Sequence, residues 1–194
     1  MASDGAMGHT PRMQTTPDRD LDSFLDHVRA APRETGVLEL IVARPERDLR
    51  ETPSVATLSV EDGLVGDGWR ARGSRSRPDG SAEPDAQLTL MSTRVLSAIA
   101  PDRSTWPLAG DQLLVDMDLG VENLPPGTRL TVGEAELEIT PLPHTGCAKF
   151  SARYGLDALR WVSTPTGRDL RMRGVYARVV RGGSIRVGEI VRKA

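Results

Sequence analysis

The stretch RLTVGEAELEIT, residues 129–140, decides the fold class of this chain. It contains a Gly133-Glu134 turn, after which apolar residues alternate with glutamates. A period of two residues is typical of a strand with one buried face, because successive side chains point to opposite sides of a sheet. The apolar residues before the turn, Leu130 and Val132, belong to the partner strand. The stretch therefore predicts a β-hairpin with an apolar inner face and an acidic outer face.

Short apolar or alternating stretches recur on both sides of this hairpin and predict further strands. Helical spacing is rarer: it occurs at residues 21–28, at 95–99, where Ser92 would cap the helix, and at 158–162. Six or more short strands with few helices predict a mainly β fold, a barrel or a sandwich with a few short peripheral helices. The predicted strands cover residues 37–43, 56–60, 88–91, 113–119, 175–180 and 185–191.

The length of 194 residues suits one domain that can bury a core without disulfides or metal ions. Residues 1–19 are polar, so we expect a disordered tail there and a single folded domain over 20–194. Within that domain, residues 70–86 are rich in Arg, Ser, Gly and Pro and are expected to form a mobile surface loop. Asp67 lies between two glycines and is expected to be a turn residue.

Composition and charge exclude several classes of function. The net charge of −2 argues against a dedicated nucleic-acid-binding protein, which needs a net basic face. No stretch reaches the roughly 18 apolar residues of a membrane span, and no secretory signal is recognisable at the N-terminus. Cys147 is the only cysteine and cannot form an intramolecular disulfide. We therefore expect a cytoplasmic protein with no nucleic-acid or membrane partner.

The segment PHTGCAKF, residues 143–150, is the sharpest candidate for chemistry, and it directly follows the acidic strand. Gly146 lets a ligand approach the backbone closely. His144 and Lys149 are potential cations beside Cys147, and a nearby cation favours the thiolate. A thiolate is either a nucleophile or a soft metal ligand. Cys147 and His144 are therefore the candidate catalytic residues.

A plainer interpretation of Cys147 remains open, because free cysteine is among the residues most often buried for purely structural reasons. His144 and Cys147 also have the spacing of half a zinc site. The other two histidines, His9 and His27, lie near the N-terminus, so a four-ligand zinc site is not expected.

Arginines are concentrated late in the chain, and guanidinium groups bind phosphate bidentately. Arg171 and Arg173 precede a predicted strand, where an anion site could lie. Arg178 and Arg186 alternate with apolar residues and are expected on a solvated strand face. Asn123 stands at a strand end, where its amide can hydrogen-bond a ligand or cap a turn.

Taken in order, several stretches resemble a MOSC domain, the C-terminal domain type of the molybdenum-cofactor sulfurases. The resemblance spans about residues 60–192, and this range includes the single cysteine and the last predicted strands. The matching stretches are Gly63-Leu-Val-Gly-Asp67, Asp85-Ala-Gln-Leu-Thr-Leu-Met91, Gly120-Val-Glu-Asn-Leu124, Leu130-Thr-Val-Gly-Glu134, His144-Thr-Gly-Cys147 and Gly183-Ser-Ile-Arg-Val-Gly-Glu189.

The resemblance implies a β-barrel-like MOSC fold and a molybdenum cofactor (molybdopterin) at Cys147, the family's key cysteine. In MOSC proteins this residue is proposed to ligate molybdenum or to carry sulfur as a persulfide. The sulfurases of the family add a pyridoxal-phosphate domain, for which 194 residues leave no room, so pyridoxal phosphate is not expected. The candidate cofactor-binding residues are His144, Thr145, Lys149 and Asn123, together with Arg171 and Arg173, which rest on guanidinium chemistry alone.

Three functions follow from this resemblance. The leading one is an oxidoreductase that reduces N-hydroxylated or N-oxide small molecules. Two electrons would pass to the substrate from a molybdenum ligated by Cys147, and an external electron donor protein would supply those electrons. The second is sulfur transfer by a Cys147 persulfide, fed by an external sulfur donor, and the third is a non-catalytic molybdopterin-binding module. Some stand-alone relatives carry a histidine-glycine pair near residues 85–91, and this chain has no histidine there.

Overall fold

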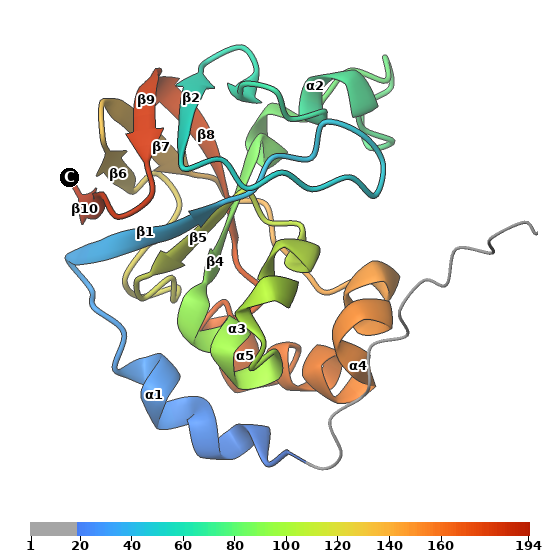
Figure 1. Ribbon diagram of the computed structural model, residues 1–194, viewed down its shortest axis with the longest axis vertical. Helices are drawn as coiled ribbons and strands as arrows, with labels where there is room; N and C mark the ends of the chain where they lie inside the picture. The colour runs from blue at the N-terminus through green and yellow to red at the C-terminus, as the bar shows by residue number, and fades with distance from the viewer. Residues whose placement is uncertain (1–18) are drawn as a thin grey trace, which may run out of the picture.

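The computed structural model describes residues 19–194 and is built around a closed barrel of β-strands (Figure 1). Neighbours around the barrel follow the order β1-β10-β6-β7-β8-β4-β5, and β5 pairs with β1 to close it. The pairing of β4 with β5 is parallel, and the other pairings are antiparallel. The barrel strands are β1 (Thr35–Ile41), β4 (Leu88–Ser92), β5 (Leu113–Asp116), β6 (Arg129–Val132), β7 (Ala135–Ile139), β8 (Val175–Arg181) and β10 (Ile190–Lys193).

The hairpin predicted from residues 129–140 is confirmed as β6 and β7. Ala135, Leu137 and Ile139 are buried in the barrel, while the intervening glutamates are partly exposed. Those glutamates pair with arginines of the neighbouring strands, for example Arg129 with Glu138 at 2.8 Å. Opposite charges across adjacent strands stabilise the outer face while the apolar face fills the barrel. The predicted mainly β class is therefore confirmed.

The predicted strand over residues 185–191 is wrong as a single element. The chain forms β9 (Gly183–Arg186), turns at Gly188, and resumes as β10. Gly188 has φ of 93°, a conformation that residues with a side chain rarely adopt, so the turn depends on glycine. The turn moves the chain between sheets: β9 pairs with β2 (Val55–Ser59), which also pairs with β3 (Gly63–Leu64), whereas β10 belongs to the barrel.

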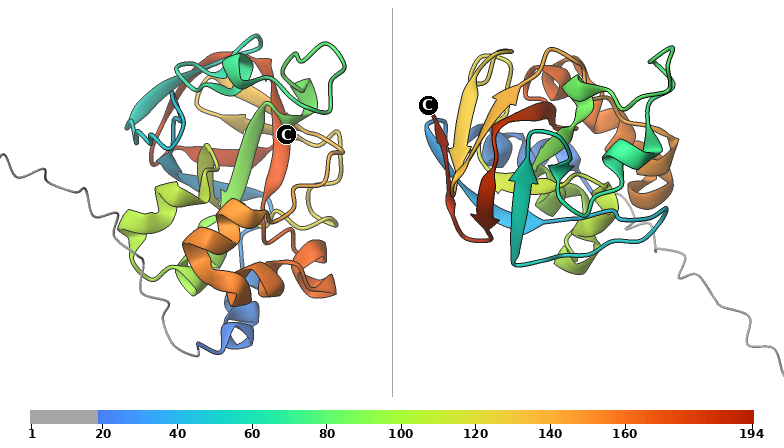
Figure 2. Two further views of the ribbon diagram at one scale, coloured as in Figure 1. Left: turned by 90° about the vertical axis from the view of Figure 1, so that its right-hand side faces the viewer. Right: turned by 90° about the horizontal axis from the view of Figure 1, so that it is seen from above.

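Most of the helices gather at one end of the barrel, in the lower half of Figure 1 and again in Figure 2, whereas the short helix at residues 69–72 lies at the upper right of Figure 1. Their apolar faces and the outer faces of barrel strands form a second core, which includes Met91, Leu96, Phe150 and Trp161. Burial of this apolar surface attaches the helical layer to the barrel. The α-helices are α1 (Leu25–Arg29), α2 (Trp69–Arg72), α3 (Thr93–Ile99), α4 (Ala148–Val162) and α5 (Pro165–Asp169), with 3-10 helices at Leu21–Phe24, Pro84–Ala86 and Arg103–Ala109.

Two helix predictions need correction. The helix predicted over 158–162 is the second half of the longer α4, which is broken at Gly155, where φ is 90° and ψ is 165°. Ser92 does stand at the N-cap position of α3, but its side chain makes no capping hydrogen bond. Its hydroxyl is instead buried without a hydrogen-bond partner among the described residues.

Three other expectations concern the surface and the tail. Residues 70–86 are mostly irregular, as predicted, apart from the short helices at either end. The predicted tail falls on residues 1–18, outside the described residues, and on Arg19. Among the described residues, no helix is both long and apolar enough to span a membrane.

Candidate functional site

Cys147 is exposed and stands at the N-cap position of α4. The loop of residues 140–146 leads to it from the end of β7, so the predicted hairpin positions the thiol. Its backbone carbonyl accepts the hydrogen bonds of the first helical turn, from Phe150 and Ser151. This backbone anchoring fixes the start of α4 and leaves the thiol open to a ligand. The interpretation of Cys147 as a buried structural residue is therefore wrong.

His144 lies three residues before the thiol but is buried. Its ring packs against Tyr176 with the ring centroids 4.5 Å apart, and its Nδ1 atom has no hydrogen-bond partner among the described residues. The Asp111 carboxylate is 3.6 Å from Nδ1, too far for a hydrogen bond. Burial lowers the pKa of His144 to about 4, more than the Asp111 charge raises it. His144 is thus neutral at pH 7, which corrects the expectation that it supplies a cation beside Cys147.

The burial of His144 predicts acid sensitivity. An unfolded histidine takes up a proton near its ordinary pKa of 6.5, whereas folded His144 does so only near 4. The unfolded state therefore binds more protons between these values, and stability falls as the pH is lowered through that window. In urea unfolding, wild type should lose about 2–3 kcal/mol more than His144→Phe between about pH 7 and about pH 4.5. Equal losses in the two proteins would contradict this account.

Beside His144, Asp111 and Arg173 form a buried ion pair. Both Asp111 oxygens accept hydrogen bonds from Arg173 Nη1, at 2.8 and 3.0 Å, and the Asp111 side chain is fully buried. The guanidinium carbon lies 4.9 Å from the centre of the Phe150 ring, one helical turn from Cys147. The pair therefore links the segment before β5, the segment before β8 and the start of α4, and it stabilises the packing of these three parts of the site.

A cavity of about 510 Å³ adjoins this pair. Several predicted residues, His144, Thr145, Arg171 and Arg173, line it together with Gly146. Gly174 lines it too, with φ of 103°, and a Cβ there would collide with the carbonyl of Leu90 and approach His144 Nδ1. The structure thus brings four of the predicted site residues to one cavity. Arg168, one of the arginines concentrated late in the chain, also lines the cavity, and the sequence analysis did not single it out.

Cys147, Asn123 and Lys149 are not among the residues that line this cavity. Asn123 lines a separate one of about 480 Å³, and its side chain is occupied within the fold. Its amide nitrogen donates to the carbonyls of Arg33 and Asp118, and its oxygen accepts from Lys193. Lys149 is exposed on the first turn of α4. The structure therefore does not bring Asn123 and Lys149 to the cavity beside Cys147.

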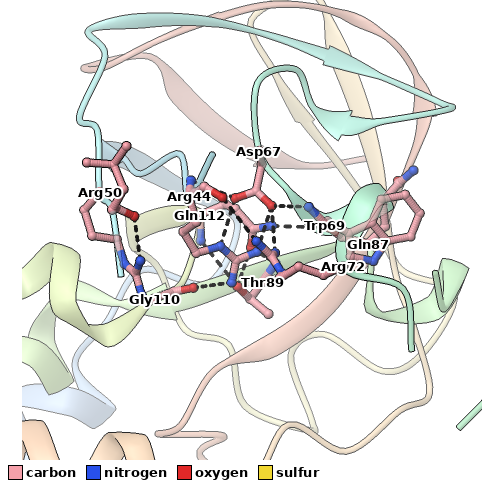
Figure 3. Close-up of polar contacts among 10 residues, drawn as sticks. Arg44, Arg50, Asp67, Trp69, Arg72, Gln87, Thr89, Gly110 and Gln112 are labelled. Atoms are coloured by element: carbon pink, nitrogen blue, oxygen red, sulfur yellow. Dashed lines mark hydrogen bonds and ion pairs between the residues drawn. The ribbon is translucent and has the colours of Figure 1, made fainter. Parts of the chain in front are cut away.

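A group of four arginines that the sequence analysis missed lies near Gly110, whose carbonyl accepts a hydrogen bond from Arg44. Figure 3 shows three of them, Arg44, Arg50 and Arg72. At the centre of the group is Asp67, whose side chain is fully buried. Arg44 binds Asp67 bidentately at 2.8 and 3.2 Å, and Arg72 binds it at 3.0 Å. Burial would raise the pKa of Asp67, but the hydrogen bonds and charges of Arg44 and Arg72 outweigh it and lower the pKa below its ordinary value. Asp67 is therefore the organising carboxylate of this group, in addition to its turn role.

Arg50 and Arg153 complete this group, which we call the arginine group (Arg44, Arg50, Arg72 and Arg153). Their guanidinium nitrogens lie 3.7 and 3.6 Å from the place where a Cβ on Gly110 would stand. Burial, together with the charges of Arg153 and Arg44, lowers the pKa of Arg50. The Nε of Arg50 is buried with no hydrogen-bond partner among residues 19–194. Among the described residues, the four guanidinium groups form ion pairs only with Asp67 and the exposed Asp48, which leaves two positive charges uncompensated there.

Comparison with known proteins agrees with the fold. The profile of the MOSC domain matches residues 77–192. The fold is similar to the crystal structures of YuaD from Bacillus subtilis (TM-score 0.56, 16% identity, covering 81% of this chain and 94% of that one) and of YiiM from Escherichia coli (TM-score 0.52, 18% identity, 81% and 69%). YiiM from Geobacillus stearothermophilus is also similar (TM-score 0.56, 13% identity, 82% and 75%).

A search of curated proteins found none that matches this chain. The structural likenesses, at these low identities, establish the fold alone. The profile match covers more than half of the chain, including the hairpin, Cys147 and the last strands. The chain belongs to the MOSC domain family.

Proposed function

We propose that this protein binds the molybdenum cofactor with Cys147 as the ligand of the metal and acts as an oxidoreductase on N-hydroxylated or N-oxide small molecules. The MOSC domain family is known to bind the molybdenum cofactor, which supports the first part. The observation that carries the proposal is the exposed thiol of Cys147 at the start of α4. The same helix contains Arg153, which belongs to the arginine group. Arg153 follows Cys147 by six positions, which corresponds to a rise of about 9 Å along the helix axis.

The residues present fit the cofactor. It consists of a metal, a pterin and a phosphate, and the protein has to supply a soft metal ligand and a partner for the phosphate. The exposed thiol of Cys147 is the soft ligand. The arginine group supplies uncompensated positive charge and the unpartnered Nε of Arg50. Guanidinium groups are suited to phosphate because they donate parallel hydrogen bonds to it.

We place the phosphate at the arginine group rather than at Arg171 and Arg173. Asp111 already neutralises Arg173 at 2.8 Å, so that guanidinium offers little net charge to a second anion. Arg171 Nη1 donates a hydrogen bond to the carbonyl of Leu124, so this guanidinium is already partly engaged within the fold. By contrast, Asp67 fixes the positions of Arg44 and Arg72 but cannot neutralise all four arginines. The remaining positive charge of the arginine group favours the binding of an anion.

Each protein residue then has a defined task. When bound, the cofactor supplies the two-electron chemistry of the reduction. Asp67 keeps the guanidinium planes of Arg44 and Arg72 fixed, so that little side-chain entropy is lost on binding. Neutral His144 packs between Tyr176 and Asp111 and maintains the wall behind the thiol, and it is not charged at pH 7. The substrate and the electron donor protein are expected to approach from the exposed side of Cys147.

Cofactor loading tests the proposal. The purified protein is incubated with cofactor released from another molybdoenzyme, unbound cofactor is removed by gel filtration, and retained pterin is measured by fluorescence after oxidation. Wild type should retain nearly one pterin per chain. Arg50→Ala combined with Arg153→Ala should lower the affinity at least about tenfold, because each charged hydrogen bond is worth about 1.5–3 kcal/mol.

The control for this loading test is Arg160→Ala, an exposed arginine on the same helix that pairs only with the exposed Asp157. It should bind the cofactor as wild type does. Equal retention in the double variant and in this control would show that the arginine group does not hold the phosphate. A wild type that retains no pterin would contradict cofactor binding altogether.

Sulfur transfer is the alternative function, and the same exposed thiol favours it. An exposed cysteine can carry a persulfide and pass its outer sulfur to an acceptor. Cyanide treatment of the freshly purified protein distinguishes the two functions. Release of one thiocyanate per chain, lost in Cys147→Ala, would favour sulfur transfer over metal ligation.

A further inference from the structure

The cavity beside His144 has no assigned occupant once the cofactor phosphate is placed at the arginine group. Its volume of about 510 Å³ lies within the usual range for small-molecule sites, about 300–1,000 Å³. The cavity is lined by the loop after β7, the end of α4, α5 and the segment before β8. None of these lining residues belongs to the arginine group. The cavity is thus a second place where a ligand can bind.

The charged residues that line the cavity are all positive. Arg168, Arg171 and Arg173 line the cavity, and no Asp or Glu is among its lining residues. Within residues 19–194, Arg173 pairs with Asp111, but neither Arg168 nor Arg171 forms an ion pair. Burial lowers the pKa of Arg171, which is consistent with a guanidinium that has lost water without gaining a carboxylate. Two cations facing a cavity without a counter-ion favour an anionic ligand.

The cavity also has apolar lining residues. They are Val121, Leu142, Val162 and Val175, and Val121 and Leu142 remain exposed at 42% and 37%. An inorganic anion would leave this apolar surface in contact with water, whereas an apolar ring or chain would cover it. Ser163 and Thr145 add neutral hydroxyls to the lining. A lining of this kind is complementary to a molecule with an apolar body and one charged end.

We infer that this cavity binds a small organic anion, a carboxylate or a phosphate monoester with an apolar body, through Arg168 and Arg171. The anion accepts hydrogen bonds from the two guanidinium groups, and the apolar body lies against Val121 and Leu142. Gly146, the residue before Cys147, lines the cavity, whereas Cys147 itself does not, so the ligand would lie near the start of α4. The inference concerns a different cavity from the proposed phosphate site and holds with or without bound cofactor.

Chemical-shift titration of the ¹⁵N-labelled full chain tests the inference with four probes: benzoate, phenyl phosphate, benzamide and inorganic phosphate. Benzoate or phenyl phosphate should shift the backbone amides of Gly146, Gly167 and Gly174, which line the cavity. Benzamide has the same ring without the charge and should bind at least about tenfold more weakly, the expected loss for one charged hydrogen bond. Inorganic phosphate should also bind more weakly than phenyl phosphate, because it has no apolar ring to contact the apolar lining residues.

Two variants and one control assign the contact. Arg168→Gln changes an exposed side chain and should weaken binding about tenfold without affecting folding. Arg171→Asn should act in the same way and keep the backbone, because asparagine tolerates the positive φ of 44° at this position. Arg186→Gln, on the exposed face of β9, should bind as wild type does.

Four results would overturn the inference: equal affinity for benzoate and benzamide, inorganic phosphate binding as tightly as phenyl phosphate, shifts confined to residues near the arginine group, or unchanged binding in both variants. The titration uses protein without cofactor. Failure here would therefore leave the cofactor proposal standing, and loss of cofactor loading would leave this inference standing.

Discussion

Replacing Asp111 with alanine should destabilise the protein by about 3–5 kcal/mol, the cost of leaving a buried charge without its partner. Arg173 is only 9% exposed, and Asp111 supplies the one carboxylate bound to it among the described residues. The Arg173 Nε is already without a hydrogen-bond partner in the described chain, so the guanidinium has little alternative once Asp111 is gone. Urea unfolding of wild type and variant at pH 7 measures the difference.

Two controls separate the buried charge from a general effect of mutation. Asp157→Ala removes the partner of Arg160 in an exposed pair and should change stability by less than about 0.5 kcal/mol. Asp111→Leu combined with Arg173→Met removes both buried charges and should recover much of the loss, because an apolar pair needs no counter-ion. If Asp111→Ala is as stable as Asp157→Ala, the buried pair does not stabilise the packing of the site.

Replacing Asp67 with alanine should also lower the free energy of unfolding by about 3–5 kcal/mol. The variant removes the carboxylate that accepts hydrogen bonds from Arg44, Arg72 and the backbone nitrogen of Trp69. It also leaves the arginine group more positive, with no carboxylate at its centre. Unfolding experiments should show the loss at pH 7. The matched control is Asp62→Ala, which breaks the exposed contact with Arg70 and a hydrogen bond from the Ser59 hydroxyl.

Acid titration checks the same carboxylate independently. The pKa of Asp67 is lowered in the folded state, so its contribution is present above the ordinary carboxyl pKa of about 3.9 and is lost as the pH falls through the lowered folded value. Asp67→Ala should therefore lose less stability than wild type across that acidic range. A variant with the pH dependence of wild type would mean that Asp67 is not stabilised by its arginines.

The barrel was predictable because its strands carry local signals. The alternation around Gly133 specifies which face of β7 is buried, and burial in the structure follows it residue by residue. The last strand was mispredicted because the apolar pattern of Ile185 to Val191 continues across Gly188, while the backbone turns there. Periodicity reports which side chains are apolar, and it does not report a turn that exchanges one sheet for another.

The site was predictable only in part, because its charged groups meet through the fold. Arg173 and Asp111 are 62 residues apart, and Arg44 and Asp67 are 23 apart, so no local spacing relates them. The strand pairings bring Asp111 and Arg173 together, since β4 pairs with both β5 and β8. The neutrality of His144 depends on burial, which a sequence motif does not show. A signal that was available is Asp111, a carboxylate placed directly before an apolar strand.

The molybdenum content of wild type and Cys147→Ala, both purified from a host that makes the cofactor, tests the central claim most directly. Mass spectrometry gives the metal per chain, and pterin fluorescence after oxidation gives the organic part of the cofactor. The account predicts nearly one molybdenum per wild-type chain and at least about a tenfold lower content in the variant, since the thiolate is the protein's bond to the metal. Equal molybdenum in both proteins, or a wild type that contains none and cannot be loaded, would contradict it.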